Sequence, residues 1–451
     1  MNYEAAVGYL LTLGRELAAP TQGTTAKFDL ENITVLAERL GRPDRAYPSA
    51  HIAGTNGKGS TAAFLESILR HAGFRTGLYT SPHLERINER IRVNGQEIED
   101  EAFAETLVRV LALIEELLAG GQLRAHPTYF ECVTAMAFEY FARSRVEFGV
   151  FEVGLGGRLD ATNILTPVVT LITRIDFDHE NFLGHSLREI AGEKAGILKA
   201  GVPLVLAEQH GEARETVLAR ADKIGCHVIE TSNAYHLDLE SFEDGCVRAQ
   251  VTEIATGWFV EIAPRLPGRF QMQNALSAVA AARLLSGQGY RIKDEDISQG
   301  IASAVWPGRI EKLQSRPDVY LDGAHNPCAA RELVAFWEQN FAGRKIWLIC
   351  GALRDKAVDE FAGALFPLAA EVIFTEPRTS RAISAAQLAE IAGDYAAHST
   401  VIADAEEAFE HALTQAAPED TIFIAGSLYL VGQLRHYWKN RAQVAMRRET
   451  P

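Results

Sequence analysis

The segment that most constrains this chain is a glycine-rich loop, Gly54-Thr55-Asn56-Gly57-Lys58-Gly59-Ser60, which follows a short apolar run. Apolar residues then recur at helical spacing, which predicts that the loop joins a strand to an amphipathic helix: Leu65, Ile68, Leu69 and Ala72. Glycines let backbone N–H groups converge on an anion, Lys58 adds a positive charge, and Ser60 is placed to hold Mg²⁺ at the helix N-terminus. The loop departs from the strict G-x-x-x-x-G-K-[ST] pattern, because Ile52 replaces the first glycine and Gly59 precedes Ser60. We interpret it as a phosphate-binding loop.

The composition is that of an ordinary globular chain with two domains. At 451 residues the chain exceeds the size at which a single core keeps growing. A net charge of -15 argues against a nucleic-acid-binding surface and leaves a local basic site free to bind small anions. The five cysteines are scattered without a C-x-x-C pair, which fits a reducing cytoplasm and no zinc site of the usual spacing.

No segment has the pattern of a membrane span or a secretion signal. The N-terminus, Met1-Asn2-Tyr3-Glu4, lacks a basic region and a long apolar run, and no later stretch approaches the roughly 18 apolar residues of a span. We expect a soluble, cytoplasmic monomer whose partners are small molecules.

Strand-like runs alternate with helical patterns from about Ser49 onward. The runs at 148–153, 168–175 and 202–207 are predicted to be buried strands of a mostly parallel sheet, because they alternate with helices. Between Cys226 and Ile262 the segments become shorter and alternating, which predicts a small antiparallel excursion beside the sheet.

A second α/β series follows with predicted strands at 319–321, 346–350, 372–375 and 421–425. Helix-length segments separate these strands, as in a Rossmann-like, doubly wound sheet. Pro307 and Gly308 break any helix between the two series and mark a linker. We therefore expect two α/β domains: residues 1–304, a P-loop-type domain with the mostly parallel sheet, and residues 305–451.

Charged side chains follow several predicted strands. Glu152 comes at the end of the strand before Gly154-Leu155-Gly156-Gly157, and His179 follows the next strand, so both are expected at the edge where open α/β sheets bind ligands. Alone, Glu152 has the pattern of a helix cap or salt-bridge partner, and His179 that of a structural histidine. Together with Ser60 they are interpreted as ligands of Mg²⁺, which prefers hard oxygen donors.

Three further motifs carry polar chemistry. Glu193-Lys194 lies in a small, apolar stretch; it is either solvated helix decoration or a partly buried lysine with a shifted pKa. The segment from Asp322 to Pro327 follows a predicted strand and places an acid and a histidine where they can touch ribose, phosphate or an amino acid. Ser427 offers a hydroxyl at another strand end.

Seven motifs occur in one order along the chain and together resemble the folylpolyglutamate synthase/dihydrofolate synthase branch of the Mur ligase family. The string E-V-G-L-G-G-R-L-D-A-T-N from Glu152 is specific to this branch, whereas the phosphate loop is shared with the peptidoglycan ligases. The motifs are Gly54 to Ser60, Ser81 to Leu84, Glu152 to Asn163, Asp178-His179, Glu193 to Ile197, Gln273 to Ala275 and Asp322 to Pro327. The resemblance implies ATP-dependent amide-bond formation between a pterin-linked carboxylate and L-glutamate, through an acyl phosphate.

The resemblance also implies roles for individual residues. Asn56, Gly57, Lys58, Gly59 and Ser60 match ATP-phosphate contacts, and Ser60, Glu152 and His179 match the Mg²⁺ ligands. Lys194 matches a lysine that is converted to an Nζ-carbamate, which would support a second Mg²⁺. Asn274, Arg309 and Asp322 match nucleotide contacts, while His325 and Ser427 match positions near the glutamate. The expected catalytic residues are Lys58, Lys194 and His325.

The resemblance also implies a pteroate pocket: Thr128 to Glu131 and Leu159 to Ala161 resemble the family segments that form it, and their aromatic rings suit stacking on a flat heterocycle. Asp29 and Asn32 replace the glycine and arginine that the family usually carries near the start of the chain. The full predicted set for this substrate is Phe28, Asp29, Ser81, His83, Thr128, Tyr129, Phe130, Leu159, Asp160 and Ala161.

We therefore expect a dihydrofolate synthase that also extends folate polyglutamates, with ATP and Mg²⁺ as cofactors. A peptidoglycan-type ligase would share the ATP chemistry but not the Glu152 string, and such enzymes usually carry an additional N-terminal substrate domain. A nucleotide-switch protein would bind ATP without glutamate-dependent phosphate release.

Overall fold

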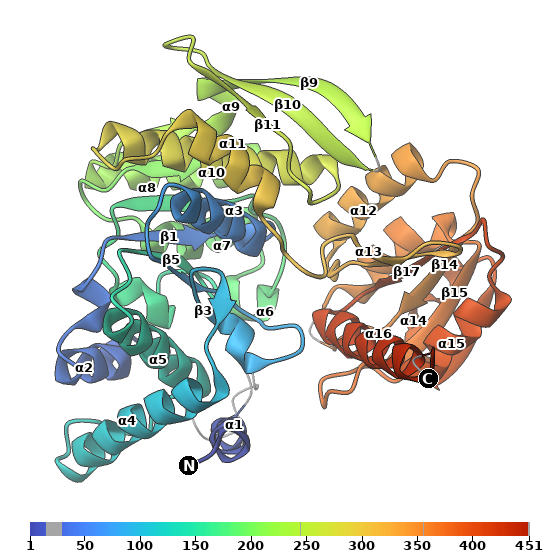
Figure 1. The fold of residues 1–451 in the computed structure, drawn as a ribbon, viewed down its shortest axis with the longest axis horizontal. Coiled ribbons are helices and arrows are strands. Elements are labelled where there is room, and N and C mark those ends of the chain that lie inside the picture. Colours follow the sequence, from blue (N-terminus) through green and yellow to red (C-terminus); the bar gives the residue numbers. More distant parts are fainter. Residues whose placement is uncertain (15–28, 244, 355, 450–451) are drawn as a thin grey trace.

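The computed structural model describes residues 1–14, 29–243, 245–354 and 356–449, which form two α/β units side by side (Figure 1). An eight-stranded sheet forms the centre of the first unit, in the order β4-β3-β2-β5-β1-β6-β7-β8. Strands from β2 to β8 in this order run parallel, while β3 and β4 are antiparallel at one edge. The strands are β1 (Ser49–Ala53), β2 (Thr76–Tyr79), β3 (Ile91–Val93), β4 (Gln96–Glu97), β5 (Phe148–Glu152), β6 (Val169–Ile172), β7 (Leu204–Leu206) and β8 (Val228–Glu230).

Helices cover both faces of this sheet, which explains why every residue of β1 and β5 is buried. The helix after the glycine-rich loop, α3, is covered on its outer side by α10 and α11, so all of its residues from 59 to 69 are buried. The helices of this unit are α1 (Tyr3–Thr12), α2 (Glu31–Arg39), α3 (Lys58–His71), α4 (Asp100–Ala119), α5 (Tyr129–Arg143), α6 (Glu180–Leu183), α7 (Leu187–Lys194), α8 (Gly211–Ile224), α9 (Thr231–Ala234), α10 (Arg269–Gly287) and α11 (Asp294–Ser303).

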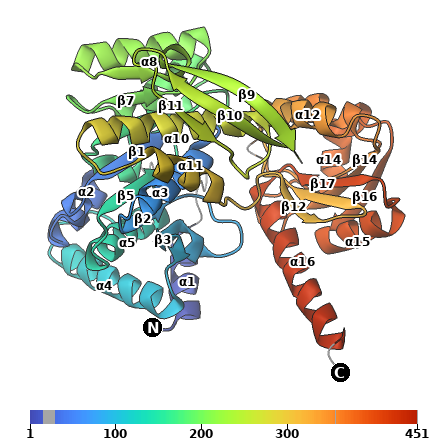
Figure 2. The same ribbon diagram turned by 45° about the horizontal axis from the view of Figure 1, so that its top comes forward.

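A separate three-stranded antiparallel sheet follows the first sheet, in the order β11-β10-β9. Its strands are β9 (Tyr235–Glu243), β10 (Cys246–Glu253) and β11 (Phe259–Ile262). Val247, Ala249 and Val251 alternate along β10 and pack into the core that α10 also enters. Figure 2 shows this sheet reaching from the first unit toward α12 of the second, where Gly245 lies against Phe336. The predicted antiparallel excursion is confirmed.

The second unit is a six-stranded sheet in the order β12-β13-β17-β14-β15-β16, parallel except for β12. Two separate apolar clusters, one on each face, show that its helices cover both sides, as the doubly wound pattern predicts. Its strands are β12 (Glu311–Gln314), β13 (Asp318–Leu321), β14 (Ile346–Cys350), β15 (Glu371–Glu376), β16 (Ser399–Asp404) and β17 (Thr421–Ala425). Its helices are α12 (Pro327–Asn340), α13 (Val358–Leu365), α14 (Ala385–Ala392), α15 (Ala405–Gln415) and α16 (Leu428–Glu449).

The segment between α11 and β12 connects the units and touches the glycine-rich loop. Trp306 packs so closely on Gly59 that a Cβ there would lie 2.9 Å from its indole nitrogen. The Arg92 guanidinium lies 5.4 Å from the centre of the same indole. Short 3₁₀ turns complete the fold: η1 (Pro43–Arg45), η2 (Ile87–Arg90), η3 (Ala161–Ile164), η4 (Ala195–Ile197), η5 (Phe366–Leu368) and η6 (Gly393–Tyr395).

The predicted fold class is confirmed in both units, with the addition that antiparallel edge strands make each main sheet mixed. Within the described part of the chain, every helix is too short or too polar for a membrane crossing.

Candidate active site

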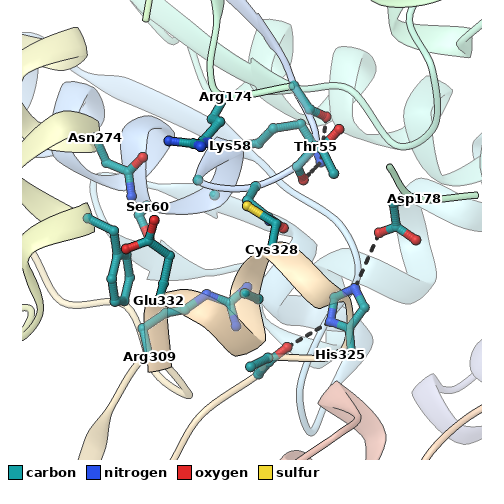
Figure 3. A pocket seen from close by; sticks show the side chains of 18 of the residues that line it. Thr55, Lys58, Ser60, Arg174, Asp178, Asn274, Arg309, His325, Cys328 and Glu332 are labelled. Carbon is teal, nitrogen blue, oxygen red and sulfur yellow. Dashed lines mark hydrogen bonds and ion pairs between the residues drawn. The ribbon is translucent and has the colours of Figure 1, made fainter. Parts of the chain in front are cut away.

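A cavity of about 370 Å³ opens between the carboxyl ends of the first sheet's central strands and the second unit (Figure 3). Both units contribute to it, because parallel strands carry the loops that follow them to one edge of a sheet. From the first unit it is lined by residues 54–60, Ser81, Glu152, Arg174, Asp178, His179, Lys194 and Asn274, and from the second by Arg309, residues 322–325, Cys328 and Glu332, among others.

The glycine-rich loop has the shape that an anion cradle needs. Gly57 has a φ of 88°, and a Cβ at this position would lie 2.1 Å from Oδ1 of Asn274. A Cβ on Gly54 would lie 1.8 Å from the Thr173 hydroxyl. Larger residues are therefore excluded at both positions by neighbouring atoms. α3 begins at Lys58 and points its N-terminal N–H groups at the cavity, which favours a bound anion.

Lys58 and Lys194 converge on the same backbone carbonyl. The Lys58 ammonium donates to the carbonyls of Gly54 and Thr55 at 3.1 Å each, and Lys194 donates to that of Gly54 at 2.9 Å. Burial lowers the pKa of Lys58. Burial, reinforced by the Lys58 charge, lowers the pKa of Lys194 to about 7. The structure thus confirms that Lys194 is buried, and it excludes the alternative of solvated helix decoration, because only 4% of the residue is exposed.

Glu152 ends β5 with its carboxylate at the cavity, where it accepts a hydrogen bond of 3.2 Å from the backbone N–H of Ser81. Ser60 lines the same cavity and is buried. A carboxylate and a hydroxyl beside a phosphate cradle fit Mg²⁺, which is usually bound by one or two carboxylates together with substrate phosphates. Among the described residues no three His, Cys, Asp or Glu side chains form a ready metal cluster. The predicted set includes two residues of those types, Glu152 and His179.

Asp178 connects the two units. Its Oδ1 lies 2.7 Å from the Lys356 ammonium, and its Oδ2 accepts a hydrogen bond of 3.1 Å from the Asn326 amide. The Asn326 and Asn56 amides also exchange two hydrogen bonds, at 3.0 and 3.2 Å, so the phosphate loop is tied directly to the second unit. Burial alone would raise the pKa of Asp178, but Lys356 and the neighbouring histidines hold it well below its ordinary value.

His325 faces Asp178 from the second unit. Its Nδ1 lies 2.7 Å from the Gly323 carbonyl and therefore carries a proton, which leaves Nε2 as the acceptor when the ring is neutral. Nε2 lies 3.6 Å from Oδ2 of Asp178. Asp322 binds the backbone of its own unit. Its carboxylate accepts hydrogen bonds from the N–H groups of Ile310 and Ala324, and burial raises its pKa.

Several of the predicted pteroate residues lie together beside the cavity, around Gly154 and Arg90. Arg90 joins two of them, because it donates to Nδ1 of His83 at 2.8 Å and lies 5.5 Å from the centre of the Tyr129 ring. Phe130 packs against Gly154, and Asp160 accepts a hydrogen bond from the Gly154 N–H. Gly154 itself lines the cavity. This arrangement brings three separated segments together.

Several predicted substrate residues already have hydrogen-bond or capping partners within the protein. Burial lowers the pKa of His83 to about 3, so the ring is neutral. Thr128 caps α5 and Asp160 caps η3, while Leu159 and Ala161 flank that cap. Asp29 accepts a hydrogen bond from the Glu31 N–H, and Ser427 from that of Tyr429. Ser81 and His325 line the cavity directly, whereas Phe28 lies outside the described residues.

Three charged residues of the second unit were not predicted from the sequence: Glu332 lines the cavity, Lys356 pairs with Asp178, and Arg331 precedes Glu332 on α12. Lys356 follows β14, and its position after a strand was the signal available for it. Arg331 on α12 pairs with Asp176 at 3.2 Å across the two units. Glu332 has no motif around it, and only its place on α12 brings it to the cavity.

A phosphate-binding loop that faces a second α/β unit across a shared cavity defines a two-domain nucleotide-binding protein. Two family models match the chain: "Mur ligase middle domain" over residues 52–282 and "Mur ligase, glutamate ligase domain" over residues 308–428. Together they cover more than half of the sequence, and the chain belongs to the Mur ligase family.

Similar proteins span nearly the whole chain. The "Dihydrofolate synthase/folylpolyglutamate synthase" of Bacillus subtilis is 36% identical over 417 residues, covering 89% of this chain and 92% of that protein. The "Folylpolyglutamate synthase" of Lacticaseibacillus casei is 33% identical and covers 96% of this chain and 98% of its own. These relatives confirm the predicted branch of the family.

Solved structures of similar proteins have the same fold as this chain. The Mycobacterium tuberculosis folylpolyglutamate synthase complexed with ADP and AMPPCP has a TM-score of 0.84 and 31% identity, covering 91% of this chain and 95% of that one. E. coli FolC in complex with DHPP and ADP has a TM-score of 0.85 and 29% identity, covering 98% and 99%. The chain is therefore an ATP-dependent ligase similar to folylpolyglutamate and dihydrofolate synthases, and the predicted enzyme class is confirmed.

Proposed function

We propose that this enzyme joins L-glutamate to 7,8-dihydropteroate and also extends the polyglutamate tail of tetrahydrofolate, each time at the expense of ATP. The observation that carries the proposal is the cavity in which the loop from Gly54 to Ser60 faces the segment from Asp322 to His325. The names of the B. subtilis and L. casei relatives support both halves of this activity.

The chemistry requires a carboxylate to become an electrophile. Transfer of the γ-phosphoryl group of ATP to the pteroate or folate carboxylate gives an acyl phosphate and ADP. The glutamate amine then attacks the acyl carbon, forms the amide and expels phosphate. Little covalent help from the protein is needed, so positioning and charge neutralisation dominate.

Charge neutralisation falls to the phosphate loop. Lys58 and the N-terminus of α3 would stabilise the negative charge on the transferred phosphoryl group. Ser60 and Glu152, with His179, would hold Mg²⁺, which when bound neutralises phosphate charge. Lys194, with its lowered pKa, has an amine that loses its proton near neutral pH and can then add CO₂. The resulting carbamate would be a second anionic group beside the phosphate loop.

The amine side of the reaction would use the second unit. The glutamate amine must lose a proton before it attacks, and Nε2 of His325 is oriented to accept one. Asp178, 3.6 Å away, would stabilise the resulting imidazolium. Residues 1–304 would then bind ATP and the pteroate, and residues 305–451 the glutamate. We further propose that the enzyme acts as a monomer in the cytoplasm.

The test is an assay of the purified protein with dihydropteroate and, separately, tetrahydrofolate, each with glutamate and ATP. Phosphate release and the mass of the product are measured together. We expect one glutamate to be added per phosphate released. ATP binding without glutamate-dependent phosphate release would contradict the proposal and favour a nucleotide switch.

A further inference from the structure

One carboxylate at the cavity lacks a described partner. Glu332 lies in the second turn of α12, is half-buried, and points into the cavity in Figure 3. The two arginines whose charge acts on it are engaged elsewhere: Arg331 pairs with Asp176 at 3.2 Å, and Arg174 lies 3.2 Å from the His210 ring. In the described part of the chain, no side chain or backbone group donates a hydrogen bond to Glu332. Asp178 and Asp322, by contrast, are both satisfied by the protein.

The position of Glu332 on α12 relates it to the phosphate loop. α12 begins beside that loop, because Asn326 and Asn56 exchange hydrogen bonds and Cys328 lies within reach of Asn56. Glu332 is four residues beyond Cys328, which is about one turn or roughly 6 Å along the helix. Asn274 lies on the same side of the cavity in Figure 3, and Phe270 also lines the cavity. A nucleotide with its phosphates in the loop would extend its ribose and base in this direction.

The charge of Glu332 limits which part of a nucleotide can bind beside it. A carboxylate repels a triphosphate in a poorly screened cavity, so Glu332 cannot serve the phosphate end. Burial raises its pKa, with Arg174 and Arg331 acting in the opposite direction. Glu332 is half-buried and faces the cavity, so its carboxylate oxygens are open to hydrogen bonds from a bound ligand. The nucleoside part of ATP offers neutral donors, which are the ribose hydroxyls and the amino group of adenine.

We propose that Glu332 is a specificity-determining residue that accepts hydrogen bonds from the nucleoside part of the bound nucleotide. The inference rests on the proposed ATP-dependent ligation and adds a residue that selects the nucleotide.

The test is calorimetric titration of the full chain with three nucleotides that cannot react: ADP, 2′-deoxy-ADP and IDP. Hydrogen bonds to charged groups contribute enough for about a tenfold or greater effect on affinity. We expect Glu332→Ala to bind ADP about tenfold more weakly than wild type. Glu332→Gln should lose less, because its amide oxygen still accepts. Glu338→Gln, which removes a charge from an exposed position on the same helix, should match wild type.

The two analogues identify the donor. If the ribose is bound, wild type discriminates against 2′-deoxy-ADP and Glu332→Ala does not. If the adenine amino group is bound, the same difference appears with IDP. The proposal is overturned if Glu332→Ala retains both discriminations, or if it binds all three nucleotides as wild type does. Because these titrations contain neither pteroate nor glutamate, a failure of the ligation assay would leave their outcome unaffected.

Discussion

The Lys356 ammonium of the second unit lies 2.7 Å from Oδ1 of Asp178 in the first, and the two side chains are only 5% and 10% exposed. This ion pair joins residues that are far apart in the sequence, and Asp178 lies across the cavity from Glu332 in Figure 3. Asn326 binds the other carboxylate oxygen at 3.1 Å. A buried charge pair therefore links the two units beside the cavity.

Removing Lys356 should leave the buried charge of Asp178 without its cationic partner. We expect Lys356→Met to lower the free energy of unfolding by about 3 kcal/mol, the scale for breaking a buried pair by deleting one partner. The double variant Lys356→Met/Asp178→Asn should recover part of that loss. Lys345→Met, at an exposed position before β14, is the matched control and should change little. Urea unfolding at pH 7 measures all three, and equal stability of the two lysine variants would contradict the role given to Lys356.

The stability difference between wild type and Lys356→Met should depend on pH in a defined direction. Because the pKa of Asp178 is lowered in the folded protein, its stabilising contribution is fully present above the unfolded value of 3.8. The contribution is lost as the pH falls below 3.8 and through the folded pKa. The stability difference between wild type and Lys356→Met should therefore narrow as the pH falls below 3.8. A constant difference would show that the carboxylate is not involved.

Lys58→Ala should lower turnover by about two to three orders of magnitude, because a preorganised charge at the transferred phosphoryl group is lost. Folding should survive, since Lys58 is only half-buried and its hydrogen bonds go to the carbonyls of its own loop. Phosphate release at saturating ATP measures the effect, with the thermal unfolding midpoint as the check on folding. Turnover close to wild type would exclude Lys58 from the reaction.

Glu152→Gln should raise the Mg²⁺ concentration needed for half-maximal activity by at least about tenfold, because a hard anionic ligand is replaced by a neutral amide. Its hydrogen bond from Ser81 can be kept by the amide oxygen, so the fold should be retained. Mn²⁺ binding followed by electron paramagnetic resonance gives a readout that does not need turnover. An unchanged metal requirement in both measurements would remove Glu152 from the proposed site.

Local pattern was sufficient for the phosphate loop and the central strands, because glycine spacing and apolar runs are properties of neighbouring residues. Strands at the edges of the sheets were harder to predict from the sequence. β12 and β16 escaped the sequence analysis because they are only partly buried, and β16 alternates between exposed and half-buried residues. Leu65 and Ile68 predicted one buried face for α3, but α10 and α11 cover the other face and come some 200 residues later.

The site residues likewise differ in whether the sequence alone could predict them. Glu152, Asp322 and His325 were found because each follows a strand within a recognisable motif. Lys356 and Glu332 have no such motif, and their roles depend on how the second unit docks against the first. His83 had the right motif, yet its ring is half-buried and accepts a hydrogen bond from the buried Arg90 instead of lining the cavity, which spacing alone does not show.

Gly432→Ala tests the contact between α16 and the loop that carries Ser81. A Cβ on Gly432 would lie 2.0 Å from the carbonyl oxygen of Leu84, and backbone cannot move aside cheaply. We expect a loss of about 1–3 kcal/mol, the usual cost of overpacking. Gly192→Ala is the matched control, because nothing lies within 4 Å of its Cβ and alanine favours its helix, α7. Thermal unfolding should separate the two variants in opposite directions; similar midpoints would contradict the tight contact.

The last prediction concerns Lys194, whose pKa is lowered to about 7 by burial and by the Lys58 charge. A buried ammonium beside a bound Mg²⁺ would be repelled, whereas a carbamate of the same side chain would be attracted. Carbamate formation needs the neutral amine, so the modified fraction should rise as the pH passes upward through about 7. We expect a ¹³C carbamate signal from wild type in ¹³C-bicarbonate that is absent from Lys194→Ala.

Lys194→Ala should also lose most activity and regain part of it with acetate, because a small carboxylate can occupy the space left by the carbamate. The fold should persist, since Lys194 donates to a single carbonyl, that of Gly54. The deciding measurement is an electron-density map at neutral pH from a crystal grown with bicarbonate, Mg²⁺ and ATP. An unmodified lysine in that map, with no carbamate signal in solution, would reject the modification, because the neutral amine, CO₂ and the cation would all have been present.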